Sequence, residues 1–263
     1  MECKKALVEA EGDFGKAEKI LKELGLAAAA KRGGRATNEG RIFTHIGESR
    51  AAIVEVACET DFVARNETFI ALGKDLAAEA AERGLQAPDE SMESKVKDAI
   101  STIKENMNVR RVETLELGSS HLAIDYIHGE GGSLGVIVVL DVENPELKEN
   151  EQVKQFAFDL ALHVAAFNPT FLSRETVDKT YLEEQESVFR KQAENMGKPE
   201  KVLQGIVQGK MKKHLAEICF TEQPFVKDDK RSVAEVAKDV GKEVGANISI
   251  VDFRYFRVGQ EVE

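Results

Sequence analysis

The segment closest to a nucleotide-binding motif is Gly205–Met211, which reads GIVQGKM. A phosphate loop has four residues between its two glycines and a Ser or Thr after its lysine, so that backbone amides cradle the phosphates and the hydroxyl meets Mg²⁺. Here three residues separate Gly205 from Gly209, and Met211 follows Lys210. The segment also lies within a helical pattern. We therefore predict no nucleotide site in this chain.

Side chains that could bind a metal or carry out catalysis are scattered. His121 and His128 could face each other across a hairpin, but two ligands make a poor metal site. The three cysteines show no metal-ligand spacing, and an odd number of thiols is typical of reduced cysteines in a cytosolic protein. Neither G-x-S-x-G nor H-E-x-x-H occurs. We expect no metal, no cofactor and no enzymatic reaction. The histidines are His45, His121, His128, His163 and His214, and the cysteines are Cys3, Cys58 and Cys219.

A short loop, TDFVARN, contains an acidic and an aromatic side chain next to each other, Asp61 and Phe62. In one interpretation Asp61 lies in the N-cap region of the next helix and Phe62 belongs to the core. In the other, both side chains are exposed and act on a partner. A later loop in the same context, VENPELKEN, has no aromatic residue. This difference favours a functional role, because a purely structural Phe need not differ between the two loops.

Charge and hydropathy exclude several classes of partner. The 263 residues carry a formal net charge of -11, and an acidic chain is repelled by the phosphates of nucleic acids. No stretch approaches the roughly 18 apolar residues that a membrane span needs. The charged N-terminus, MECKKALVEAEGD, lacks the apolar region of a signal peptide. We expect a cytoplasmic protein that binds neither nucleic acid nor membrane.

Hydrophobic periodicity in the first half predicts an α+β fold. A small helical hairpin covers residues 1–25. Its second helix ends at Gly25, before a linker, and its apolar stripe consists of Phe14, Ala17, Ile20, Leu21 and Leu24. RIFTHI and AAIVEVACE predict a β-hairpin. An amphipathic pattern then predicts a helix over Glu67–Gly84, and a helical hairpin follows over Met92–Met107.

The second half repeats this plan. VETLELG, HLAIDYIH and LGVIVVLDVE predict strands, with a turn at His128–Gly132 and a helix over Glu149–Phe167. Both halves contain a strand, a short polar loop and a helix in the same order, which indicates an internal duplication. A helix is predicted over Ser232–Gly245. The final strand, NISIVDFRYFRV, is expected to complete the second sheet.

Residues 174–218 differ from both halves. They form two long, highly charged helical patterns that are broken at Gly197–Pro199, and their apolar positions are sparse. A narrow apolar stripe on two consecutive helices predicts an antiparallel helical arm.

Four stretches together resemble the elongation factor Ts family: MECKKAL, CETDFVARN, LHVAAFNPTFL and GIVQGKMKKHLAEICFTEQPFVKDD. They occur in the family's order, and the resemblance covers nearly the whole chain. It implies a ubiquitin-associated-like helical domain at 1–27, two related α+β core subdomains at 28–115 and 116–263, and a coiled-coil arm at 174–218. It also implies that the helical domain has only its second and third helices here, and that the extra C-terminal module of some relatives is missing.

The resemblance further implies a function. Family members bind elongation factor Tu, GDP-bound and nucleotide-free, and promote GDP release by disturbing its magnesium site. The segment that acts there corresponds to Thr60, Asp61, Phe62 and Val63. Further partner contacts are implied for Leu134, Gly135, His163 and Lys4. The chain could also pair with a second copy through its core.

Two other classes of function stay open. The chain could be a non-enzymatic adaptor or dimerising interaction protein that binds a partner without promoting exchange. A metabolic enzyme would need a concave site with a perturbed acid–base pair, and the sequence shows no such pair.

Overall fold

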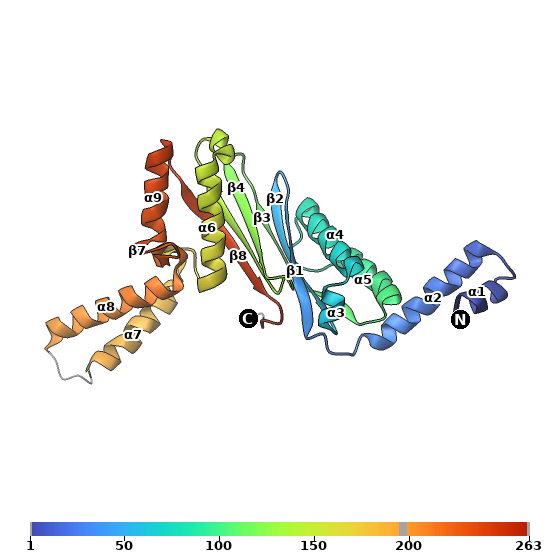
Figure 1. Cartoon of the computed structure of the whole chain (residues 1–263). Helices are drawn as coiled ribbons and strands as arrows, with labels where there is room; N and C mark the ends of the chain where they lie inside the picture. The colour runs from blue at the N-terminus through green and yellow to red at the C-terminus, as the bar shows by residue number, and fades with distance from the viewer. Residues whose placement is uncertain (1, 195–198, 262–263) are drawn as a thin grey trace. The chain divides into compact units, whose positions relative to one another are not determined.

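The computed structural model describes residues 2–194 and 199–261, which fold into a mixture of helices and sheets (Figure 1). Two compact units can be distinguished by their internal contacts. The first comprises residues 1–117, 125–137 and 254–263, and the second comprises 118–124 and 138–253. These two units are not the domains implied by the family resemblance, at 1–27, 28–115 and 116–263, and that division stays a prediction.

The N-terminal helices are α1 (Glu2–Glu9) and α2 (Phe14–Arg32), which pack through the buried Ala6, Ala10 and Ala17. Asp13 caps α2 by accepting a hydrogen bond from the Lys16 backbone N–H at 3.0 Å. Two predictions for α2 are wrong. The helix continues past Gly25 to Arg32, and both Phe14 and Leu24 are exposed.

Gly25 continues the helix because its missing side chain permits close packing. A Cβ atom there would lie 2.7 Å from the Cβ of Ser101 on a neighbouring helix. The alanines that follow have the highest helix propensity, so no residue there favours a break.

The first sheet has the strand order β1-β2-β3, with both pairs antiparallel. Its strands are β1 (Glu39–Ile46), β2 (Arg50–Cys58) and β3 (Met107–Glu116). The predicted hairpin of the first two strands is confirmed. The central strand, β2, is buried from Ala51 to Cys58. This burial explains why its sequence is almost continuously apolar rather than alternating.

Two helices pack beside this sheet (Figure 1): α4 (Glu67–Arg83) and α5 (Glu90–Ile103). The prediction for α4 is confirmed, with Gly84 as a left-handed C-cap. The helical hairpin predicted over Met92–Met107 is wrong, because α5 is a single helix. Its buried Met92, Val96 and Ile100 recur every four residues without interruption, and the chain turns only at Lys104, which has a φ of 70°.

The second sheet has the order β4-β5-β8. Its strands are β4 (His121–His128), β5 (Leu134–Asp141) and β8 (Ser249–Arg257), so the last strand joins this sheet as predicted. After β5, a 3₁₀ turn at Pro145–Glu149 leads into α6 (Glu151–Phe167). The small hairpin of β6 (Pro224–Phe225) and β7 (Asp228–Ser232) precedes α9 (Val233–Val244), which begins with a capping box of Ser232 and Glu235.

Helices α7 (Lys179–Glu194) and α8 (Glu200–Ile218) pack against each other in opposite directions. The Tyr181 hydroxyl lies 2.9 Å from the His214 Nε2 atom, and Arg190 pairs with Glu200. The predicted break includes Gly197 and Lys198, which lie outside the described residues, and Pro199 is the N-cap of α8. No described helix combines the length and apolar character that a membrane crossing requires.

The helix pair should be removable. Phe171 and Cys219 form a backbone bridge at its base, so residues 173 and 219 end close together. Replacing residues 174–218 by a short Gly-Ser turn should leave cooperative unfolding in place, as measured by circular dichroism during heating. Loss of a cooperative transition would show that the helix pair belongs to the main core.

Candidate partner-binding site

The candidate site is a single helical turn, α3 (Asp61–Ala64), which follows β2 directly. The Thr60 side chain caps this turn by accepting a hydrogen bond from the Val63 backbone N–H at 3.3 Å. A second cap follows at once, because the Asn66 side chain accepts from the Thr68 backbone N–H at 2.8 Å and so starts α4. The interpretation of Asp61 as an N-cap residue is therefore wrong in detail. Thr60 and Asn66 are the caps, and Asp61 is the first helical residue.

Phe62 projects from this turn into solvent with 80% of its surface exposed. The next two residues, Val63 and Ala64, are buried in the core of the first unit together with Phe69. The alternative that Phe62 is a core residue is wrong. The α3 turn therefore holds a large aromatic side chain in water.

Asp61 is also exposed. Its carboxylate lies 3.6 Å from the Arg65 guanidinium, one helical turn later, and both side chains are more than half exposed. An ion pair in such a position is weak, because water screens both charges. The Asp61 carboxylate can therefore exchange Arg65 for a partner group at little cost.

Of the other predicted contact residues, Lys4 is exposed, whereas Leu134 and Gly135 are buried. The open backbone of Gly135 serves packing within the chain, because a Cβ atom there would overlap the Ile42 side chain and lie 3.0 Å from Ile127. The group that approaches it in this structure is Ile42.

His163 is fully buried on α6. Its Nδ1 atom accepts a hydrogen bond from the Val226 backbone N–H at 3.1 Å, so the proton lies on Nε2, which is 2.8 Å from the Gln223 Oε1 atom. Burial lowers the pKa of His163 below 6.5, and the Gln223 hydrogen bond opposes this only in part. His163 is therefore a neutral residue with its hydrogen bonds satisfied.

Sequence reasoning missed the exposed aromatic side chain that covers His163. The Phe167 ring lies 4.7 Å from the His163 ring, and half of the Phe167 surface is exposed. The sequence signal was its place as the last residue of α6, where a helix face meets solvent. In this region Phe167, rather than His163, presents its side chain to solvent.

The three cysteines differ in their surroundings. Cys58 and Cys219 are buried and free, and Cys3 is exposed and free. Burial, reinforced by the charge of Glu105, raises the pKa of Cys58 to about 12. Burial also raises the pKa of Cys219 to about 11, with Glu222 contributing. Neither buried thiol forms the thiolate that nucleophilic or metal chemistry requires at neutral pH.

No cluster of three or more metal-ligating side chains occurs within residues 2–194 and 199–261. The idea that His121 and His128 face each other across a hairpin is wrong, because they lie at opposite ends of one strand, β4.

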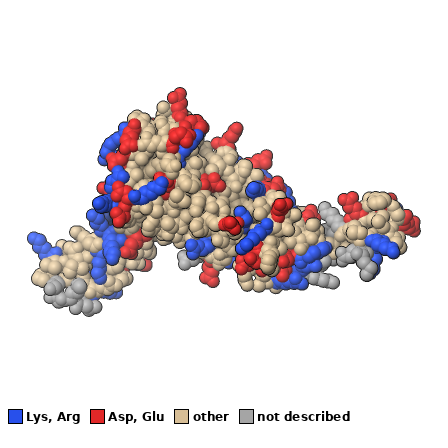
Figure 2. Space-filling view, in the orientation of Figure 1, with Lys and Arg blue, Asp and Glu red and all other residues tan. Residues whose placement is uncertain are grey.

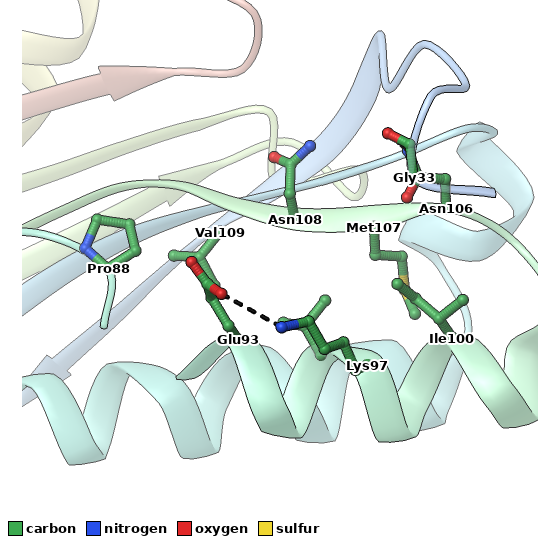
Figure 3. Close-up of a pocket in the computed structure, with 10 residues that line it drawn as sticks. Gly33, Pro88, Glu93, Lys97, Ile100, Asn106, Met107, Asn108 and Val109 are labelled. Atoms are coloured by element: carbon green, nitrogen blue, oxygen red, sulfur yellow. Dashed lines mark hydrogen bonds and ion pairs between the residues drawn. The ribbon is translucent and has the colours of Figure 1, made fainter. Parts of the chain in front are cut away.

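A cavity of about 380 Å³ opens between α5 and the start of β3 (Figure 3). Its polar lining includes the ion pair of Glu93 and Lys97, whose charged atoms are 3.3 Å apart, and the amides of Asn106 and Asn108. These lining groups do not form a nucleophile and base pair of the kind that catalysis requires.

Comparison with known proteins identifies the family of this chain. The family described as Elongation factor TS matches residues 59–260, which include the whole α3 turn. The chain belongs to the elongation factor Ts family. Elongation factor Ts of Borrelia recurrentis is 44% identical over 258 residues, which is 98% of this chain and 93% of that protein. Elongation factor Ts of Treponema denticola is 44% identical over 259 residues, covering 98% and 92% of the two chains.

The exposure of Phe62 can be tested through stability. Phe62→Ala should change the free energy of unfolding by no more than about 0.5 kcal/mol, as expected of a surface site. The matched control Phe69→Ala, at a fully buried position of the same unit, should cost about 3–5 kcal/mol. Urea denaturation measures both values. A comparable loss in the two variants would mean that Phe62 packs in the core.

The neutral state of His163 predicts a pH dependence. The unfolded chain binds a proton at this residue near pH 6.5, whereas the folded chain resists protonation until lower pH. The contribution of His163 to stability is therefore complete above pH 6.5 and is lost as the pH falls below it. Urea denaturation between pH 7.5 and 5.5 should show this slope. His163→Gln should flatten it; an unchanged slope would argue against a buried neutral His163.

Proposed function

We propose that this chain binds elongation factor Tu with GDP and promotes GDP release, so that GTP can load. The observation that carries the proposal is the exposed Phe62 on a turn that Thr60 caps and that leads directly into α4, which Asn66 caps. Family membership supplies the class of partner, and the α3 turn supplies groups suited to the work.

The proposed mechanism acts on the partner's magnesium site. A GTPase holds GDP partly through Mg²⁺ that bridges to phosphate oxygens. The Phe62 ring enters between packed elements beside that site, while the Asp61 carboxylate competes for the contacts that hold the ion. Because α3 is anchored by Val63 and capped by Thr60, little conformational entropy is lost when it inserts.

Coupling between the two ligands must be reciprocal. If the bound chain weakens the affinity of the partner for GDP, then GDP weakens the affinity of the partner for the chain by the same factor. Nucleotide at high concentration, in practice GTP, then displaces the chain and completes the cycle.

The finer architecture is also part of this proposal. In both sheets the middle strand, β2 or β5, leads through a short turn into a long helix, α4 or α6. This repetition supports two core subdomains that arose by duplication. Helices α1 and α2 would belong to a ubiquitin-associated-like module, with α7 and α8 as an inserted arm.

Further contacts support the binding role. Lys4 is exposed and could face an acidic surface of the partner, and Phe167 offers an apolar contact over His163. Leu134 and Gly135 would act through the backbone at the start of β5, since their side-chain positions are buried. Pairing of two copies through the core remains part of the proposal.

Direct binding of nucleic acid is not part of the proposed function. On the face drawn in Figure 2, Lys and Arg side chains are interspersed with Asp and Glu. A nucleic-acid surface would instead show a continuous basic stripe. We propose that the chain works in the cytoplasm, where translation factors meet their partners, and carries out no chemical reaction itself.

The second candidate is an adaptor that binds the same partner without exchange. It is favoured only by the helix pairs α1–α2 and α7–α8, which are elements separate from the α3 turn that carries Phe62. The two functions differ in one measurable respect: an adaptor leaves the rate of GDP release unchanged.

The test is the release of fluorescent GDP from elongation factor Tu with and without this protein. The protein should accelerate release, and Phe62→Ala should lower the maximal stimulated rate at least tenfold. Phe14→Ala is the matched control, because Phe14 is equally exposed, at 79%, and lies outside the α3 turn. It should keep the maximal rate. Equilibrium dialysis should show no GDP bound to the chain alone.

Two results would count against the proposal. If the wild-type protein binds the partner without accelerating release, the adaptor function is correct. If Phe62→Ala keeps the full stimulated rate, exchange depends on another part of the surface.

A further inference from the structure

Two carboxylates connect the start of the α3 turn to the loop between α5 and β3. One belongs to each of the two segments, and each accepts a hydrogen bond from the backbone of the other. The Glu105 carboxylate accepts a hydrogen bond from the Thr60 backbone N–H at 3.2 Å. The Glu59 carboxylate accepts one from the Asn106 backbone N–H at 2.5 Å. The adjacent residues Glu59 and Thr60 thus pair with the adjacent residues Asn106 and Glu105, respectively.

Glu105 also controls the cap of α3. The Thr60 hydroxyl donates to the Glu105 carboxylate oxygens at 3.0 and 3.1 Å, and the same hydroxyl oxygen accepts from the Val63 N–H. Because the hydroxyl proton is directed at Glu105, its lone pairs are left to face Val63. The carboxylate therefore orients the group that begins the turn carrying Phe62.

The second loop is itself immobilised. Asn106 is buried, and its side-chain amide donates to the Arg35 backbone carbonyl at 2.7 Å. Figure 3 shows Asn106 beside Gly33, at one end of the cavity along α5. Glu105 follows directly on Lys104, the left-handed C-cap of α5, so its backbone position is fixed by the end of a long helix.

A helix of four residues cannot hold its own shape in water, since nucleation is unfavourable and most helical stability comes from packing. Hydrogen bonds to a carboxylate are stronger than those between neutral groups. Thr60 offers two donors to Glu105, its backbone N–H and its hydroxyl, which is shared between the two carboxylate oxygens. These bonds hold the turn at its N-terminal side, and the burial of Val63 and Ala64 in the core holds the rest.

We propose that Glu105 is a positioning residue for stimulated GDP release, which holds Thr60 and thereby presents Phe62 in the orientation that the partner requires. This inference rests on the proposed function of the α3 turn. Glu105 need not touch the partner or the nucleotide, because its effect passes through Thr60.

The second unit offers a matched control. Glu143 lies in the loop after β5, as Glu59 does after β2, and its carboxylate accepts a hydrogen bond from the Asn247 backbone N–H at 2.7 Å. Like Glu105, Glu143 uses its carboxylate to accept a hydrogen bond from a backbone N–H of another loop. The loop after β5 carries no aromatic side chain. Glu143→Ala removes a comparable bond without affecting Phe62.

The experiment measures stimulated GDP release as a function of the concentration of the full-length protein, for the wild type, Glu105→Ala, Glu105→Gln and Glu143→Ala. Circular dichroism first confirms the folded fraction of each variant. Hydrogen–deuterium exchange of the segment 59–66 then reports whether the turn is loosened. Glu105→Gln keeps one oxygen that can accept a hydrogen bond from Thr60. It therefore still tests the proposal if Glu105→Ala does not fold.

We expect Glu105→Ala to lower the maximal rate about tenfold while the half-saturating concentration changes less than about twofold. Exchange of the 59–66 amides should accelerate about tenfold. Glu105→Gln should recover at least half of the wild-type rate, and Glu143→Ala should retain all of it per folded molecule.

The proposal is overturned if Glu105→Ala and Glu143→Ala lower the rate equally per folded molecule, or if Glu105→Ala keeps the wild-type maximal rate. It is also overturned if Glu105→Gln stays folded but recovers no rate, because a retained acceptor should restore the turn. A wild-type protein that fails to stimulate release refutes the proposed function itself, which is a separate result.

Discussion

The burial of Val63 and Ala64 is the constraint on which the candidate site depends. Successive residues of a helix point about 100° apart, so a face centred between these two lies about 150° from Phe62. Once Val63 and Ala64 enter the core beside Phe69, the Phe62 side chain has no route inward. The apolar packing of the first unit thus maintains an exposed aromatic side chain that hydrophobic burial alone would oppose.

Side-chain caps and carboxylate hydrogen bonds fix the backbone position of the α3 turn. Thr60 begins the turn, Asn66 begins the next helix, and the carboxylates of Glu59 and Glu105 connect the turn to the loop before β3. In the second unit the turn at Pro145–Glu149 has no buried residue. The same order of strand, turn and helix therefore exposes an aromatic side chain, Phe62, in the first unit, whereas in the second unit the turn only connects β5 to α6.

Much of the fold follows from the sequence alone. The β1–β2 hairpin, helix α4 with its Gly84 cap, and the return of β8 to the second sheet are encoded in local patterns of hydrophobicity and in turn residues. The errors arose where tertiary contacts decide. Gly25 resembles a helix stop, but it is the point where α2 packs closely against Ser101.

The candidate site shows the same division. The TDFV segment could be located from the sequence, but the exposure of Phe62 could not, because the burial of Val63 and Ala64 depends on the sheet beneath them. The role of Glu105 was also hidden, since 45 residues separate it from Thr60. The sequence also could not show that His163 is buried, with hydrogen bonds to Gln223 and Val226.

The most direct test of the central claim is the environment of residue 62 in the complex. The chain contains no tryptophan, so Phe62→Trp introduces a single tryptophan at the tip of the α3 turn. A partner without tryptophan, or one whose own emission is subtracted, allows this signal to be read. In the free protein the emission should be that of a solvent-exposed indole. On binding elongation factor Tu it should shift to shorter wavelength, as the ring leaves water. The account would be contradicted if the complex forms and GDP is released while the emission spectrum stays unchanged.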